Sequence, residues 1–265
     1  LPRRAPVRVG RQPCDAGFAT RSRAAGWRGA AARLQGFAAV EHGYPAAVRD
    51  VYQEQLDRLA DGLADMCNLV AEALDNATRA LLRADLWLAE QVITDDARID
   101  DLRTVAEQQA FTLLLLHAPV ATDLRIVVSG LHAASDLERM GDLALHIARA
   151  ARRRHPDPVM PAEVAPCLAE MGRVGSAMAR EAGQVIRTRD LERAIEIEAA
   201  DDAMDDLHRR LFTLLLNPTW PHGIGPAIDI TLIGRFYERY ADHAVALARQ
   251  VVFVVTGRLP DPVTA

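Results

Sequence analysis

Two short segments of the form Glu-Arg-x-x-Asp carry the clearest sign of chemistry in this sequence. The first places Glu138 and Asp142 four residues apart, and the second repeats the spacing at Glu238 and Asp242. On an α-helix this spacing stacks both carboxylates on one face, where they repel each other by about 0.2–0.5 kcal/mol. A repulsive pair that recurs one hundred residues later needs a cause, and a bound cation is the first to consider.

Pairs of aspartates precede both segments, and counting along the expected helices places them opposite the Glu-x-x-x-Asp pairs. Asp100 lies 19 residues before Pro119, which ends a helix, and Glu138 lies 19 residues after it. At 1.5 Å per residue both are about 28 Å from the bend. The same count places Asp205 and Glu238 about 18 and 20 Å from the second bend. Two clusters of carboxylates are therefore predicted: Asp96, Asp100, Glu138 and Asp142, then Asp201, Asp205, Glu238 and Asp242.

So many close negative charges must either raise their own pKa values or bind a cation. Oxygen-rich clusters suit hard or borderline ions. The predicted cofactor is a divalent or trivalent metal ion, with iron, manganese, magnesium and zinc all left open. The alternative is a surface salt-bridge network in which Arg139 and Arg239 neutralise the acids. Aspartate doublets at 95–96, 100–101, 201–202 and 205–206 also leave open which member of each faces inward.

Five further residues are accessory candidates. His146 lies one turn beyond Asp142, and His243 directly follows Asp242, although a lone histidine also suits a structural role. Asp123 lies near the start of the helix expected at 122–153, where a simpler explanation is that its charge caps the helix. The accessory set is His146, His243, Asp136, Asp123 and Arg125.

Several other chemistries are excluded by the sequence. The chain contains no Lys, so a phosphate-loop lysine, a Schiff base and a Lys general base are ruled out. Asp205-x-x-His208 approaches a di-iron helix motif, but a ferritin-like oxidase needs Glu-x-x-His twice and this chain has none. The acidic clusters argue against nucleic acid as a main partner.

Six helices follow from the apolar spacing, which keeps to steps of three and four from Asp50 onward. The residue before Pro119 ends one of them, and Gly257 with Pro260 ends the last. The first expected helix spans about 52–83, and a short break near 84–85 starts the second, which continues to 116. The other four are expected at about 122–153, 162–188, 190–216 and 226–256.

The second three helices repeat the first three. Phe111-Thr112-Leu113-Leu114-Leu115 matches residues 212–216, Asp96 and Asp100 match Asp201 and Asp205, and Arg149 matches Arg249. The predicted fold is all-α, with two tandem three-helix bundles related by internal duplication. A proline-rich stretch around 155–161 marks the boundary, which gives bundles at 48–155 and 156–257.

The first 47 residues differ from the rest. They carry a formal charge of about +6 and no sustained period, while the remainder holds about −11 of the total −5. We expect residues 1–47 to be a disordered, dispensable leader translated from a miscalled start, with Val48 as the natural beginning, and residues 258–265 to be a disordered tail. Isolated Cys14, Cys67 and Cys167 fit a reducing compartment, and no apolar run reaches a membrane span, so a cytoplasmic protein is expected.

Three segments together carry a resemblance to a known family. Residues 123–125 are DLR, residues 136–148 are DLERMGDLALHIA, and residues 238–249 are ERYADHAVALAR. In this order and spacing, and after the opening VYQEQLDRL, the sequence resembles the PhoU phosphate-signalling regulators over about residues 48–257. Residues 1–47 lie outside the resemblance.

The resemblance implies an all-α protein, often a homodimer, that binds multinuclear metal clusters through Glu/Asp-x-x-x-Asp motifs. In this sequence those motifs are the eight acids above. It also implies a negative regulator of phosphate-starvation signalling and phosphate uptake, which couples the ATPase of a phosphate ABC transporter to a sensor histidine kinase. Such proteins are adaptors and are not regarded as enzymes. We expect this protein to have no integral membrane segment, with peripheral association through its partners left open.

Two alternatives stay open at this point. One is a carboxylate-bridged metalloenzyme on a helical bundle, which uses the clusters for hydrolysis or redox chemistry. The other is a helical scaffold that holds no metal.

Overall fold

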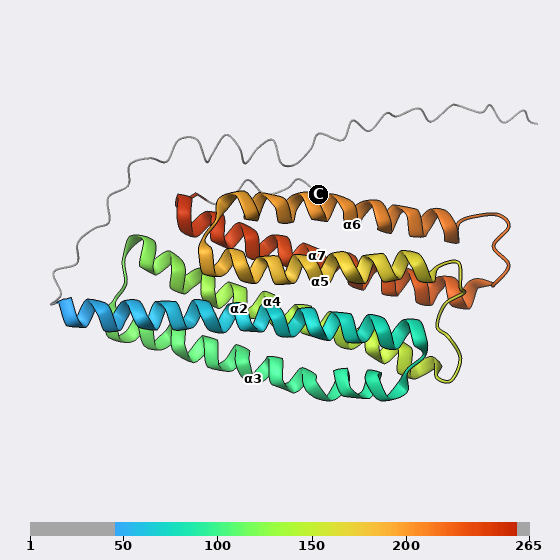
Figure 1. The fold of residues 1–265 in the computed structure, drawn as a ribbon, viewed down its shortest axis with the longest axis horizontal. Helices are drawn as coiled ribbons and strands as arrows, with labels where there is room; N and C mark the ends of the chain where they lie inside the picture. Colours follow the sequence, from blue (N-terminus) through green and yellow to red (C-terminus); the bar gives the residue numbers. More distant parts are fainter. Residues whose placement is uncertain (1–45, 259–265) are drawn as a thin grey trace, which may run out of the picture.

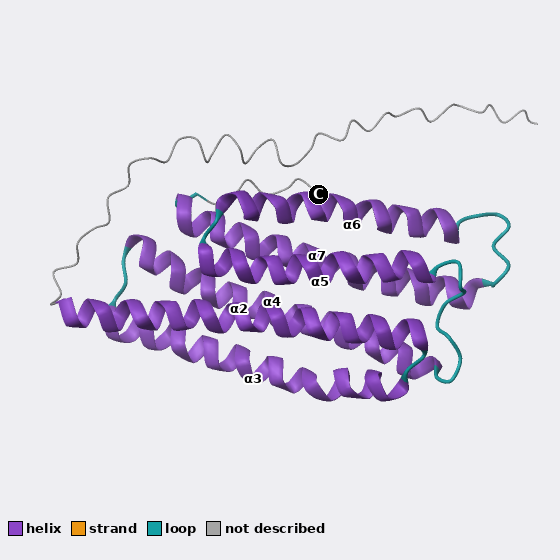
Figure 2. Ribbon diagram, viewed as in Figure 1, coloured by secondary structure: helices purple, strands orange, loops and turns teal. Residues whose placement is uncertain are grey.

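The computed structural model describes residues 46–258, and this part of the chain is built from six helices without a strand. Figure 2 shows the helices joined by short connections, as the apolar spacing predicted. The all-α fold class is thus confirmed. The helices are α2 (Ala46–Arg83), α3 (Leu86–His117), α4 (Ala121–Arg154), α5 (Ala165–Thr188), α6 (Leu191–Leu215) and α7 (Ile224–Thr256).

The helices form two up-and-down bundles that lie side by side along one long axis (Figure 1). Helices α2, α3 and α4 make the first bundle, and α5, α6 and α7 make the second. Between the bundles α2 packs along α5 and α4 along α7, while α3 and α6 lie on the outside. One hydrophobic core runs through both bundles. The α3–α4 and α6–α7 turns lie at opposite ends of the molecule.

Matched caps begin the second helix of each bundle. The Asp85 carboxylate accepts a hydrogen bond from the Leu88 N–H, and the Asp190 carboxylate accepts from the Glu192 and Arg193 N–H groups. These bonds satisfy N–H groups that have no partner inside the helix. The residue before each cap, Ala84 and Arg189 respectively, adopts the left-handed conformation, with φ of 50° and 56°. The duplication therefore extends to the backbone of the turns.

Two helix starts depart most from the expected bounds: α2 begins at Ala46 instead of about 52, and α5 begins later than expected. The helix begins at Ala165 instead of about 162, because Pro161–Val164 form a turn closed by the Val164 N–H on the Pro161 carbonyl at 3.1 Å. The predicted leader and tail lie outside the described residues, apart from residues 46–47 in α2 and residue 258. No helix of the described region has the length and apolar character to cross a membrane.

Glycines on α5 allow it to lie unusually close to α2. A Cβ at Gly172 would lie 2.5 Å from the Thr78 Oγ1, and one at Gly183 would lie 3.0 Å from the Cys67 Cβ and 3.2 Å from the Ala64 carbonyl oxygen. Both are below ordinary contact distance, so the helix separation depends on the missing side chains. This contact joins the two bundles into one core.

A buried pair of hydroxyl groups joins α7 to α2 near this contact. The Thr78 hydroxyl donates to the Leu74 carbonyl at 2.7 Å, so its bond to the Tyr237 hydroxyl, at 2.8 Å, uses the tyrosine as donor. Tyr237 is fully buried, and burial raises the pKa of its phenol well above the usual range. The tyrosine therefore stays neutral and links α7 to α2.

We predict opposite effects for two Gly→Ala substitutions in helices. Gly172→Ala should lower the free energy of unfolding by about 1–3 kcal/mol, because its methyl group overlaps Thr78. Gly62→Ala meets nothing within 4 Å and should raise it by about 0.5–1 kcal/mol through helix propensity. Urea unfolding followed by circular dichroism measures both, and a stabilising Gly172→Ala would contradict the close α2–α5 contact.

Candidate functional site

The first acidic cluster (Asp96, Asp100, Glu138 and Asp142) lies across the α3–α4 hairpin. Two of its acids come from each helix, as the count from the bend predicted. Gly141 sits between the two acids of α4, and a Cβ there would lie 2.8 Å from the Ile99 Cδ1 and 3.3 Å from an Asp96 carboxylate oxygen. The glycine therefore lets α3 approach α4 at the height of the cluster.

Asp96 shows the electrostatic cost of this arrangement. Partial burial, together with the charges of Asp100, Asp142 and, more weakly, Glu138, raises the pKa of Asp96 to about 6. Arg149 acts in the opposite direction and offsets part of the shift. The other three acids of the first cluster thus all act on Asp96, and a positive charge beside it would be stabilised.

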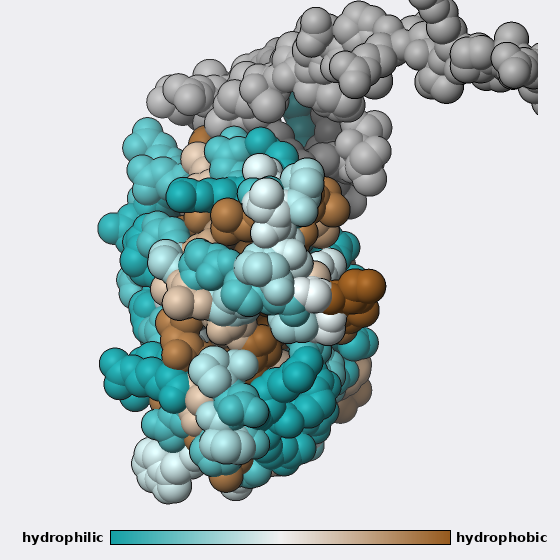
Figure 3. Space-filling model, turned by 90° about the vertical axis from the view of Figure 1, so that its right-hand side faces the viewer, coloured by the Kyte–Doolittle hydropathy of each residue, from teal (hydrophilic) through white to brown (hydrophobic). Residues whose placement is uncertain are grey.

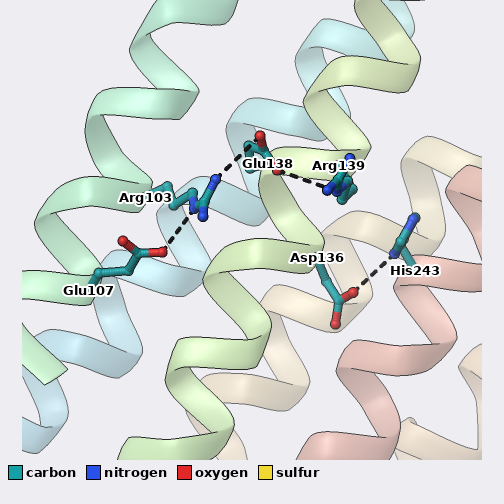
Figure 4. Close-up of polar contacts among 6 residues, drawn as sticks. All are labelled: Arg103, Glu107, Asp136, Glu138, Arg139 and His243. Carbon is teal, nitrogen blue, oxygen red and sulfur yellow. Dashed lines mark hydrogen bonds and ion pairs between the residues drawn. The ribbon is translucent and has the colours of Figure 1, made fainter.

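Two arginines form ion pairs with Glu138 (Figure 4). The Arg103 guanidinium lies 3.4 Å from one Glu138 oxygen and also donates to Glu107 at 2.9 Å. The Arg139 Nε lies 3.8 Å from the other oxygen, Oε2. That oxygen is buried and accepts no hydrogen bond from the described residues. Arg103 was not anticipated from the sequence, because a salt bridge between neighbouring helices leaves no spacing signal.

The second acidic cluster (Asp201, Asp205, Glu238 and Asp242) repeats the arrangement across α6 and α7. Burial and the charge of Asp242 raise the pKa of Glu238, although Arg235 forms a short ion pair with it and lowers the pKa in part. Desolvation by the surrounding protein also raises the pKa of Asp242. The charge of Arg235 opposes this shift, and the charge of Asp205 adds to it. Arg235 therefore plays the part in this cluster that Arg103 plays in the first.

The second cluster contains one acid that the sequence did not single out. Glu198 is 2% exposed, lies one turn before Asp201 on α6, and forms an ion pair with Arg249 at 3.4 Å. Its Oε2 accepts no hydrogen bond from the described residues. Comparison of the repeats could not reveal it, because the matching residue of the first repeat is Ile93. The two clusters thus differ by one buried carboxylate.

The doublets are oriented by the helix packing. Asp201 is buried, with 3% of its surface exposed, whereas its neighbour Asp202 is exposed. Asp96 and Asp205 are likewise more buried than the aspartates beside them, although both members of the 100–101 doublet are exposed. Burial therefore singles out Asp96, Asp201 and Asp205 in their doublets, but neither member of the 100–101 doublet.

As they stand, the acids do not form a coordination shell. Within residues 46–258 no three Asp, Glu, His or Cys side chains converge closely enough to hold a metal ion. Glu138 and Glu238 instead form ion pairs with Arg103 and Arg235, respectively. Carboxylate oxygens are the ligands that a hard cation prefers. The acidic side chains would have to move closer together to bind one.

Three accessory candidates lie between the two repeats instead of inside a cluster. The His243 Nδ1 lies 3.0 Å from an Asp136 oxygen, which joins α7 to α4 (Figure 4). The His146 ring stacks on Phe236 with centroids 5.3 Å apart. His243 still acts on the neighbouring Asp242 through its charge. The structure therefore assigns these residues to the α4–α7 contact.

The remaining two candidates lie near the first turn of α4. Asp123 is in that turn, where a negative charge is favourable. The Arg125 Nε donates to the Val254 carbonyl at 3.2 Å, and its Nη2 donates to the Thr122 hydroxyl at 2.9 Å. Arg125 thus joins α4 to the last turn of α7, at the end of the hairpin away from the first acidic cluster.

Comparison with known proteins gives matches over both repeats. The pattern of the PhoU domain matches residues 63–151 and again residues 168–251. The phosphate-specific transport system accessory protein PhoU homolog 2 of Mycobacterium tuberculosis is 52% identical over 213 residues, which are 80% of this chain and 100% of that protein. PhoU homolog 1 of Mycobacterium leprae is 51% identical over 214 residues, or 81% of this chain and 96% of that protein.

Solved structures agree with the fold. A crystal structure of the phosphate transport system regulatory protein PhoU from Streptococcus pneumoniae matches with a TM-score of 0.72 and 27% identity, over 80% of this chain and 100% of that chain. PhoU from Pseudomonas aeruginosa matches with a TM-score of 0.71 and 27% identity, over 78% of this chain and 100% of that chain.

We predict that Asp96→Asn stabilises the protein after treatment with a chelator. The folded-state pKa of Asp96, about 6, exceeds the usual 3.8, so ionisation costs stability as the pH rises through this range. At pH 7.5 the variant should be more stable by about 1 kcal/mol, allowing for solvent screening, and at pH 3 the difference should vanish. Asp95→Asn, on the exposed neighbour, is the control for urea unfolding, and an equal gain in both variants would contradict the prediction.

Proposed function

The chain belongs to the PhoU family, and we propose on this premise that it regulates phosphate uptake as an accessory protein of a phosphate transport system. The matches to relatives of the same kind cover nearly the whole described region. On this proposal the protein acts as a negative regulator and holds phosphate-starvation signalling silent when phosphate is plentiful. It works as an adaptor and catalyses no reaction itself.

We further propose that each acidic cluster holds one or more metal ions. The observation that supports this most directly is the repetition of facing carboxylates, with raised pKa values at Asp96, Glu238 and Asp242. The donors are all oxygens, as hard cations require. A bound cation would supply the positive charge that the acids lack. Binding would need Glu138 and Glu238 to leave Arg103 and Arg235.

Exposed apolar residues at both hairpin turns support action through protein contacts. Although the chain is 25% charged, residues 108–122 and 211–228 contain no Asp, Glu, Lys or Arg. Figure 3 faces the end that carries the α6–α7 turn, where apolar side chains break a mostly hydrophilic surface. The same positions are exposed in both repeats, which is typical of interaction surfaces. The matched pairs are Phe111 with Phe212, Leu115 with Leu216, and Leu124 with Ile224.

The proposed partners are the ATPase of the phosphate transporter and a sensor histidine kinase. Equivalent apolar turns at opposite ends give the molecule two places to bind protein, as an adaptor between two partners requires. A homodimer, through one of these ends or another face, is part of the same proposal.

The function is tested by deleting the gene in its host and following a phosphate-starvation reporter in phosphate-rich medium. We expect the reporter to switch on in the deletion strain and to fall silent again when the full chain, or a chain that starts at Val48, is returned. A reporter that stays silent in the deletion strain would contradict the regulatory role.

We predict that Arg235→Ala strengthens metal binding at the second acidic cluster. Arg235 competes with a cation for Glu238, so its removal should raise Mn²⁺ affinity several-fold, by about 1 kcal/mol for one ion pair near the surface. Titration of chelator-treated protein with Mn²⁺ measures the change. Arg209→Ala, which removes an arginine paired with exposed Asp206, is the control and should leave the affinity unchanged; weaker binding by Arg235→Ala would count against the proposed site.

A further inference from the structure

A narrow slot opens where helices of both repeats meet, away from the acidic clusters. Its volume is about 50 Å³, and its walls come from α2, α4, α5 and α7. Leu59, Leu63, Leu247 and Val251 supply a buried apolar surface. Small-molecule sites are typically concave and apolar, with a few polar groups that converge on them.

Two residues that line the slot differ from their counterparts in the second repeat. With the offset that relates Glu138 to Glu238, Gly130 and Ala133 of the slot correspond to Ile230 and Ile233 of α7. Those two isoleucines are fully buried in the second repeat. The first repeat thus lacks two large side chains that are buried at the matched positions of the second.

A second matched pair shows the same divergence. Asp229 and Arg154 form a short ion pair between α7 and α4 at one end of the molecule. At the other end Asp229 corresponds to Ser129 and Arg154 to Val254, and both of these residues line the slot. An ion pair that joins the helices at one end is therefore replaced by a valine and a small hydroxyl at the other.

The Ser129 hydroxyl has no hydrogen-bond partner among the described residues, although the side chain is only 5% exposed. Other helix hydroxyls, such as that of Thr231, donate to the carbonyl four residues earlier. A buried polar group without a partner costs about 1–3 kcal/mol. The hydroxyl is available to a molecule in the slot.

Two more polar groups lie at the rim of the slot. Arg189 and Gln250 are half-buried, and within residues 46–258 neither side chain forms a hydrogen bond or an ion pair. Arg187, two residues before Arg189, instead pairs with acids of α2. The counterpart of Arg189 in the first repeat is Ala84, in the same left-handed conformation. The backbone of the turn therefore does not require an arginine.

We propose that this slot binds a small amphiphile made of a short alkyl chain and one anionic carboxylate. The apolar walls accept the chain, and Arg189, Gln250 and Ser129 supply donors for the carboxylate oxygens. Guanidinium groups bind carboxylates through paired, charge-assisted hydrogen bonds. The slot opens at its rim, where Arg189 and Gln250 are half-buried, so the alkyl chain need not fit wholly within the enclosed volume.

Calorimetric titration of the full-length protein with butyrate, pentanoate and hexanoate tests the proposal. We expect saturable binding whose affinity rises about three- to fourfold for each added methylene group. Hexan-1-ol, which lacks the charge, should bind more weakly. The absence of binding by all three carboxylates at millimolar concentration would overturn the proposal.

Two variants place the ligand in the slot. Arg189→Ala keeps a backbone that Ala84 already adopts, and it should weaken hexanoate binding about tenfold or more. Ala133→Ile copies the second repeat and should abolish binding by filling the slot; circular dichroism checks its folding, and Arg189→Ala carries the test if it misfolds. Arg173→Ala, on an exposed arginine of the same helix, is the control. Hexanoate binding of unchanged strength in Arg189→Ala would place the ligand elsewhere and overturn the proposal.

Discussion

The close contact between α2 and α5 is the constraint on which the architecture depends. Gly172 and Gly183 let the two helix backbones approach until Thr78, Cys67 and the backbone of Ala64 fill the interface. Because this contact joins the repeats through their first helices, the remaining hairpins, α3–α4 and α6–α7, are left to extend toward opposite ends. Each hairpin then presents one acidic cluster along its length and one apolar turn at its tip. The proposed metal and protein contacts are thus separated within each repeat.

Differences between the repeats carry as much information as their likeness. The backbone turns, the helix caps and the facing acids are shared. The second cluster adds the buried acid Glu198 and its partner Arg249, where the first has Ile93. The first repeat has Gly130 and Ala133 where the second has the buried Ile230 and Ile233, and these two small residues line the slot. Duplication therefore supplied a frame in which matched positions took up different chemistry, and the two ends of the molecule are not interchangeable.

Local patterns predicted most of the fold, and tertiary packing decided the rest. Steps of three and four residues predicted the six helices because each buries a long apolar stripe. Counting from the bends predicted that Asp96 and Asp100 lie opposite Glu138 and Asp142. The ion pair of Arg103 with Glu138 was not predictable, since it depends on which rotamer reaches a neighbouring helix. Arg235 and Glu238 lie three residues apart on α7, and this pair was not singled out from the sequence. Glu198 was missed because only the second repeat carries an acid at this position. The slot was not predicted because small residues such as Gly130 and Ala133 give no sequence signal of a cavity.

The most direct test of the account is the metal content of the protein after purification and gel filtration. Elemental analysis by mass spectrometry should find bound metal in the wild type, at one or more ions per acidic cluster. The variant that combines Glu138→Gln, Asp142→Asn, Glu238→Gln and Asp242→Asn should remain helical and lose that metal. A wild type without metal, or a variant that retains the full amount, would contradict the claim that the duplicated acids are cation sites.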